Sequence, residues 1–102
     1  MIIGVFSKNE EGGFYGAINT AGLHIEGALF EKQDRGADYV LSGEYGDHAY
    51  EVGAAWFKTG DFGDYLSAKI DSPILAGAIY AMMKLAPSDD GYSTLRWSRP
   101  HD

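Results

Sequence analysis

The fold is decided by the stretch VGAAWFKTGDFGDYLSAKID, residues 52–71. In its second half Leu66, Ala68 and Ile70 alternate with polar residues, which is the pattern of a strand with one face in a core and the other toward water. Glycines at positions 60 and 63 mark a turn ahead of that strand. The stretch therefore predicts two antiparallel strands joined by a glycine-containing turn.

Turn signals continue outward from this hairpin at a spacing of about ten residues, which is typical of an all-β sandwich or barrel. We predict a single domain over residues 1–102, folded as a small antiparallel β-barrel or sandwich of six to eight strands. A five-stranded barrel of the kind that binds oligonucleotides is one variant, by analogy alone. The turn signals each contain glycine and lie at residues 9–13, 21–22, 33–38, 46–47 and 88–91.

Residues 72–87 allow two local structures. A serine and a proline at the start fit a helix cap and a first helical position, Pro87 fits a stop, and Ala, Leu, Met and Lys between them are good helix formers. The alternative is a short turn and then a strand over 78–85, paired as a hairpin with a strand over 92–97. Local sequence does not decide between them, so one short helical turn stays in the prediction.

The composition excludes several classes of protein. The chain has no cysteine, which removes disulfides, thiolate zinc sites and thiol nucleophiles together. The opening MIIGVF lacks the basic region and long apolar stretch of a signal peptide. No apolar run approaches the roughly 20 residues that a membrane span needs. We expect a soluble cytoplasmic protein without membrane contact.

The net charge of −7 is spread unevenly along the chain. Residues 1–51 hold three basic and nine acidic side chains, whereas residues 52–102 hold five basic and six acidic ones. The simplest interpretation is a solvated acidic surface. A second interpretation is an acidic face that repels or imitates nucleic acid, with a nearly neutral second half free for another task.

One aromatic and lysine pattern within residues 52–71 points to chemistry. On strands, Trp56 and Lys58 project to one side, and Tyr65 and Lys69 lie on the polar side of the partner strand. If Trp56 faces inward it is a core residue, which is the commoner role of an aromatic on a strand. If it faces outward, the surface suits single-stranded nucleic acid, whose bases stack on rings while cations follow the phosphates. Spacing alone leaves both interpretations open.

A second cluster of this kind closes the sequence. Trp97 is flanked by Arg96 and Arg99. The plainer interpretation puts Trp97 in the core and pairs both arginines with acids elsewhere. In the functional interpretation Arg99, fork-shaped and always charged, contacts a phosphate or a carboxylate.

Catalytic and metal-binding patterns are absent from the sequence. His24, His48 and His101 are isolated, with no HxH, HxxxH or HExxH spacing. No serine lies in a GxSxG elbow, and neither a GxxxxGK[ST] loop nor a GxGxxG loop occurs. We therefore expect no enzyme, no catalytic residue, no metal site and no cofactor.

Four segments together resemble one known family. They are Met1–Phe6, Val52–Trp56, Tyr65–Pro73 and Leu95–Pro100, in the right order and with compatible gaps over nearly the whole chain. The sequence is thereby similar to the domain of unknown function 736 family, which consists of small bacterial proteins often encoded near conjugative or other mobile-element genes. The resemblance implies no assigned activity and no catalytic residues to transfer.

The chain departs from the family pattern in two places. Phe57 stands where the family typically has a second lysine after the tryptophan, which weakens a phosphate-binding interpretation of this hairpin. The stretch 74–84 is also more apolar than the resemblance leads us to expect. The family's equivalent of 78–85 looks extended, which tilts that segment toward a strand.

Two non-catalytic functions follow from these observations. The first is a module that binds single-stranded nucleic acid in mobile-element transfer or regulation. The alternative is an acidic interaction module, a DNA mimic or regulator, that binds a basic protein partner; open sheet edges would also let two copies pair as a homodimer. The nucleic-acid hypothesis assigns the binding role to Trp56, Lys58, Tyr65, Lys69, Trp97 and Arg99. The alternative assigns its acidic face to Glu26, Glu31, Asp34, Asp38, Glu44, Asp47 and Glu51.

Overall fold

Antiparallel strands make up almost all of the regular structure in a computed structural model that describes residues 1–20, 22–45, 48–72 and 77–97. Within these residues no helix is long and apolar enough to cross a membrane. The eight strands are β1 (Ile2–Lys8), β2 (Phe14–Thr20), β3 (Leu23–Lys32), β4 (Tyr39–Tyr45), β5 (His48–Gly60), β6 (Gly63–Ile70), β7 (Ile79–Lys84) and β8 (Ser93–Trp97).

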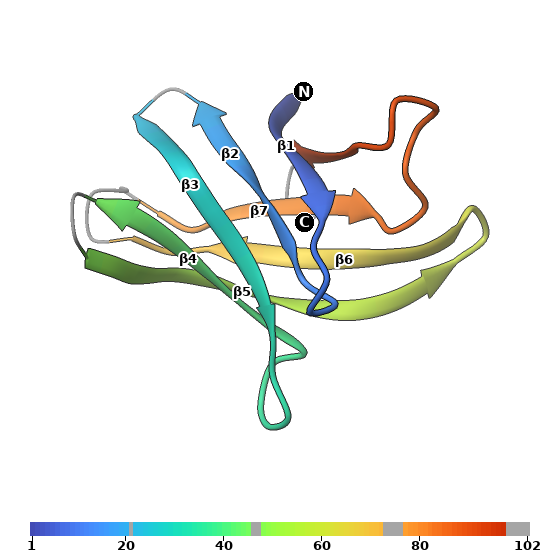
Figure 1. Cartoon of the computed structure of the whole chain (residues 1–102), viewed down its shortest axis with the longest axis horizontal. Coiled ribbons are helices and arrows are strands. Elements are labelled where there is room, and N and C mark those ends of the chain that lie inside the picture. Colours follow the sequence, from blue (N-terminus) through green and yellow to red (C-terminus); the bar gives the residue numbers. More distant parts are fainter. Residues whose placement is uncertain (21, 46–47, 73–76, 98–102) are drawn as a thin grey trace.

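The strands close into one barrel in simple sequential order (Figure 1). Each strand pairs antiparallel with the next along the chain, and β8 returns to pair with β1. The all-β barrel is thus confirmed at the upper end of the predicted strand number, and the five-stranded variant is wrong. Both β1 and β8 have two neighbours, whereas the part of β5 beyond Ala55 pairs with β6 alone among the described strands. The pairing of two copies through a sheet edge stays a prediction.

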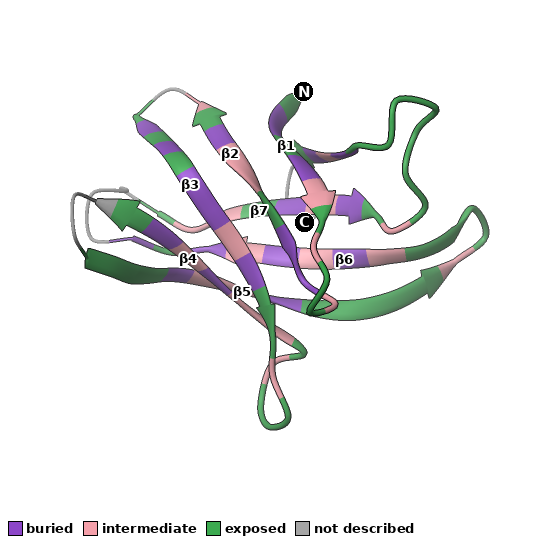
Figure 2. Ribbon diagram, viewed as in Figure 1, coloured by how far each residue is buried: buried purple, intermediate pink, exposed green. Residues whose placement is uncertain are grey.

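The barrel interior is filled by side chains, as expected for eight strands. The rings of Phe6 and Phe30 lie at its centre, both fully buried, with centroids 5.0 Å apart and planes inclined at 52°. Leu66, Ala68 and Ile70 point into the same core, as their alternation predicts. Figure 2 shows this alternation as buried and exposed bands along the strands.

The segment 72–87 contains a strand, because β7 pairs with β6 on one side and β8 on the other. A turn joins β7 to β8, in which the Gly91 amide donates to the Ser88 carbonyl at 2.8 Å. This confirms the strand alternative. The expected helical turn after Ser72 falls on residues 73–76, and the expected turn at 46–47 joins β4 to β5; both lie outside the described residues.

A bulge in β5 sets which of its side chains face outward. The pairing of β4 with β5 shifts between Leu41 and Ser42, so that Val52 becomes an extra residue on β5. Strict alternation predicts that Val52 and Trp56 share a face. Instead Val52 is buried and Trp56 is exposed, because the bulge reverses the alternation between them.

The far half of β5 projects beyond β4 as a hairpin with β6. Its pairing with β4 ends at Ala55, whereas its pairing with β6 continues to Gly60 and Gly63. Gly63 closes the turn with a φ of 110°, a left-handed conformation that favours glycine. The Phe57 amide, which lies past the end of β4, donates to Asp38 Oδ2 at 2.7 Å. This hairpin carries the aromatic and lysine pattern seen in the sequence.

Candidate functional site

Three rows of outward-facing side chains cross the strands β5 to β8. The middle row pairs Trp56 with Ser67, Ser67 with Met82, and Met82 with Arg96. Neighbouring strands lie about 4.8 Å apart, so this row spans about 14 Å of surface. The two flanking rows lie two residues away along each strand and therefore project to the same side.

The flanking rows add most of the charge. One consists of Lys58, Tyr65 and Lys84, and the other brings Lys69 beside Tyr80. Trp56 has 40% of its surface exposed, so this side of the sheet faces solvent. We call this surface the basic aromatic face, and it consists of Trp56, Lys58, Tyr65, Lys69, Tyr80, Met82, Lys84 and Arg96.

The cations of this face form no ion pair with a carboxylate among the described residues. No described carboxylate lies within 4.0 Å of Lys58, Lys69, Lys84 or Arg96; the ion-pair distance recorded in this part of the chain joins His24 to Glu26. Lys84 instead places its Nζ 5.1 Å from the centre of the Phe62 ring. That ring packs against Tyr65 with centroids 5.3 Å apart. The cations are therefore available to a ligand with negative charge.

Two acids near the face accept hydrogen bonds from residues other than its cations. Asp64 accepts a hydrogen bond from the Thr59 hydroxyl at 3.1 Å, and Asp38 accepts from the Phe57 amide. Among the four cations, Lys69 alone lines a shallow hollow together with two acids, Glu51 and Asp71. Lys69 is therefore the weakest of the four cations as an anion site.

The structure brings together four of the six residues that the sequence singled out, namely Trp56, Lys58, Tyr65 and Lys69. Trp97 does not join them, because it pairs with buried Ala81 and so has the opposite orientation on β8. It lies near Met1, whose carbonyl accepts from the Trp97 amide at 2.8 Å. Arg99 lies outside the described residues.

Sequence reasoning missed several members of the face, chiefly Tyr80, Lys84 and Arg96. The signal that could have found the first two is the alternation of Tyr80, Met82 and Lys84, which is informative only once 79–84 is known to be a strand. Arg96 was noted beside Trp97, but an alternating strand puts the two on opposite sides. Of this pair, Arg96 is the one that lies on the basic aromatic face.

The phenylalanine at position 57 does not remove a positive charge from the basic aromatic face. It pairs with fully buried Leu66 and so lies on the inner side of the hairpin, although the hairpin's projection leaves it 48% exposed. A lysine at this position, as in the family pattern, would therefore stand on the other side from Trp56 and Lys58. The departure does not weaken the phosphate-binding interpretation of the outer side.

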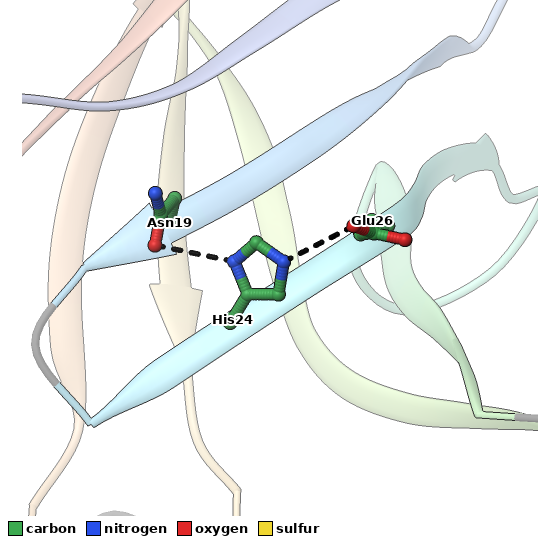
Figure 3. A network of polar contacts seen from close by, with 3 residues as sticks. All are labelled: Asn19, His24 and Glu26. Carbon is green, nitrogen blue, oxygen red and sulfur yellow. Dashed lines mark hydrogen bonds and ion pairs between the residues drawn. The ribbon is translucent and has the colours of Figure 1, made fainter.

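Acidic side chains gather on another part of the barrel. Glu26, Glu31 and Glu44 are exposed on β3 and β4, which are four strands away from β7 and β8 in a ring of eight. His24 lies beside them, with Nε2 3.4 Å from Glu26 Oε1 and Nδ1 3.2 Å from Asn19 Oδ1 (Figure 3). Of the seven acids that the sequence assigns to an acidic face, these three lie on β3 and β4, and in the structure we keep the name acidic face for them. Asp34 and Asp38 lie between β3 and β4, Glu51 lies beside Lys69, and Asp47 is outside the described residues. Further exposed acids, Asp61, Asp64, Asp89 and Asp90, lie on the segments that carry the basic aromatic face, so negative charge is not confined to one side of the barrel.

No constellation for catalysis emerges from the part of the chain that the structure describes. No group of three or more histidine, aspartate or glutamate side chains there could hold a metal ion. A cleft of about 710 Å³ adjoins the basic aromatic face under residues 85–92. This side of the barrel offers exposed aromatic rings and positive charge.

The comparisons with known proteins identify the family and no further relative. No curated protein and no solved structure matches the chain. A family model described as "Protein of unknown function (DUF736)" matches residues 2–100, which is nearly the whole sequence. The chain therefore belongs to the DUF736 family of proteins of unknown function.

Proposed function

We propose that the protein binds single-stranded nucleic acid on the basic aromatic face, without catalysis, in the transfer or regulation of mobile elements. The observation that carries the proposal is that four cations and three aromatic rings converge on one outward surface of an otherwise acidic chain. A solvated surface would not need four of the eight basic residues on one side of the sheet. Nor would it need Trp56 exposed among them.

The physical basis is the combination of stacking and charge. An aromatic ring holds a base with about 1–3 kcal/mol, and it does so for any base because each has a π face. Lys58, Lys84 and Arg96 would follow the phosphates, and the acidic face on the opposite side would repel a strand that tried to wrap further. The proposal thus implies a short footprint with little sequence preference.

A salt titration tests this proposal. We expect a fluorescently labelled oligothymidylate of about 12 nucleotides to bind at low salt, as followed by fluorescence anisotropy. With three or four phosphate contacts, the logarithm of the association constant should fall against the logarithm of salt concentration with a slope of about −2 to −3. Absence of binding at low salt, or a slope near zero, would contradict the proposal.

The acidic face supports a second candidate function, which is binding of a basic protein partner. Its support is that Glu26, Glu31 and Glu44 are all exposed on the adjacent strands β3 and β4. A labelled oligolysine in the same titration separates the two candidates. Binding of oligothymidylate with no binding of oligolysine favours the first, and the reverse result favours the second.

A further inference from the structure

A cleft lies beside the basic aromatic face, and stacking of bases on Trp56 does not account for it. It has a volume of about 710 Å³, within the range of pockets that hold small molecules. The strands β7 and β8 form its floor, with Met82, Lys84, Thr94 and Arg96. The loop 85–92 forms one wall, and Phe62 at the tip of the β5–β6 hairpin forms another.

The loop that covers the cleft is held in shape by its own hydrogen bonds. The carbonyl oxygen of Tyr92 lies 2.9 Å from the Ser88 amide nitrogen and 2.8 Å from the Ser88 hydroxyl. The Tyr92 amide donates to Asp90 Oδ1 at 3.0 Å, and Gly91 turns the chain with a φ of 86°. These bonds fix the backbone that presents the Tyr92 ring to the cleft. The backbone position of Tyr92 is therefore set before any ligand arrives.

The lining of the cleft is matched to one nucleotide. Tyr92 and Met82 supply an aromatic and an apolar surface, and the ring of Tyr92 is 47% exposed. Lys84 and Arg96 supply two positive charges, and neither carboxylate of the loop, Asp89 or Asp90, lines the cleft. The Lys84 ammonium lies over the Phe62 ring, and its N–H donors that point away from the ring can bind an anion.

We infer that this cleft is a subsite for a single nucleotide, with its base against Tyr92 and its phosphate between Lys84 and Arg96. The inference rests on the proposed function and deepens it. It makes the cleft one defined position in the path of the strand, where the base lies against a wall of the cleft. Around Trp56, by contrast, bases stack on the open surface of the sheet.

Binding of thymidine monophosphate to the intact chain tests the inference, with thymidine and inorganic phosphate as comparison probes. Thymidine monophosphate should shift the backbone amide resonances of Tyr92 and Thr94 and compete with oligothymidylate, more strongly than either comparison probe. Tyr92→Ala should weaken thymidine monophosphate about fivefold or more, the loss of one stacked base. Tyr92→Phe should retain binding. Tyr15→Ala removes a tyrosine of similar exposure on β2 and should change nothing.

The outcomes separate this inference from the function on which it rests. If oligothymidylate binds but thymidine monophosphate does not, and Tyr92→Ala leaves oligothymidylate unchanged, the subsite is overturned and the proposed function stands. If inorganic phosphate binds as tightly as thymidine monophosphate does, the cleft is an anion site and the nucleotide assignment is overturned. If neither the oligonucleotide nor the nucleotide binds, both proposals fail.

Discussion

Replacing Lys58 and Lys84 by glutamate together is expected to weaken oligothymidylate binding by about 30-fold or more, which corresponds to a loss of at least about 2 kcal/mol. Both side chains are exposed and flank Tyr65 in one row of the face. Each substitution removes an attraction to phosphate and adds a repulsion, of about 1 kcal/mol each even in water. The salt slope should also fall by about 1.4, because two phosphate contacts are lost. Anisotropy titrations at several salt concentrations measure both quantities.

The matched control is the pair Lys8→Glu and Lys32→Glu. These lysines are also exposed, but they lie at the ends of β1 and β3, away from the basic aromatic face. The control changes the net charge by the same amount, so it reports the general repulsion between a more acidic protein and DNA. We expect it to weaken binding only a few-fold and to leave the slope unchanged. Equal losses for the two pairs would show that net charge, and not this face, governs binding.

Phe30→Ala is expected to lower the free energy of unfolding by about 3–5 kcal/mol, the usual cost of truncating a buried phenylalanine. Phe30 is fully buried and packs on Phe6 in the centre of the barrel. A domain of this size is stable by about 5–15 kcal/mol, so the substitution removes a large part of the total. Urea unfolding followed by circular dichroism measures the change as a lower midpoint.

Leu29→Ala is the control for this prediction. Leu29 is the neighbour of Phe30 on β3, but it is only half-buried, on the outer side of the barrel. Its truncation should cost clearly less than that of Phe30. If both substitutions lower the midpoint equally, the packing of Phe6 on Phe30 is not what holds the barrel closed.

Local patterns predicted the strands well where neighbours in sequence are also neighbours in space. The alternation of Leu66, Ala68 and Ile70 located β6, and the glycines at 60 and 63 located its hairpin with β5. The barrel's closure was not predictable in the same way, because the pairing of β1 with β8 joins the two ends of the chain. No local pattern records such a pairing.

The wrong or open predictions have specific physical causes. Val52 broke the alternation because a bulge inserts one residue in β5, and a bulge depends on the partner strand β4. Residues 79–84 have good helix formers, and only pairing with β6 and β8 makes them a strand. Tertiary context overrides such local preferences.

Only part of the candidate site could be predicted from the sequence, because only part of it lies on one local hairpin. Trp56, Lys58, Tyr65 and Lys69 lie on one local hairpin, so alternation and a turn were enough to group them. Lys84 and Arg96 reach the face only through the ladders of β7, which local sequence left undecided. A single sequence does not show that residues belong to one site when only pairing between separate strands brings them together.

We expect the oligonucleotide to lie on the outward side of β5 to β8, where Trp56 would sense it and Trp97 would not. The two tryptophans are almost equally exposed, Trp56 at 40% and Trp97 at 37%, but they have opposite orientations on their strands. In the variant Trp97→Phe, the remaining Trp56 fluorescence should be quenched as oligothymidylate is added, and quenching should saturate together with anisotropy. In the variant Trp56→Phe, the Trp97 fluorescence should stay unchanged. If Trp97 is quenched and Trp56 is not, or if neither tryptophan is quenched, the oligonucleotide does not lie on the basic aromatic face.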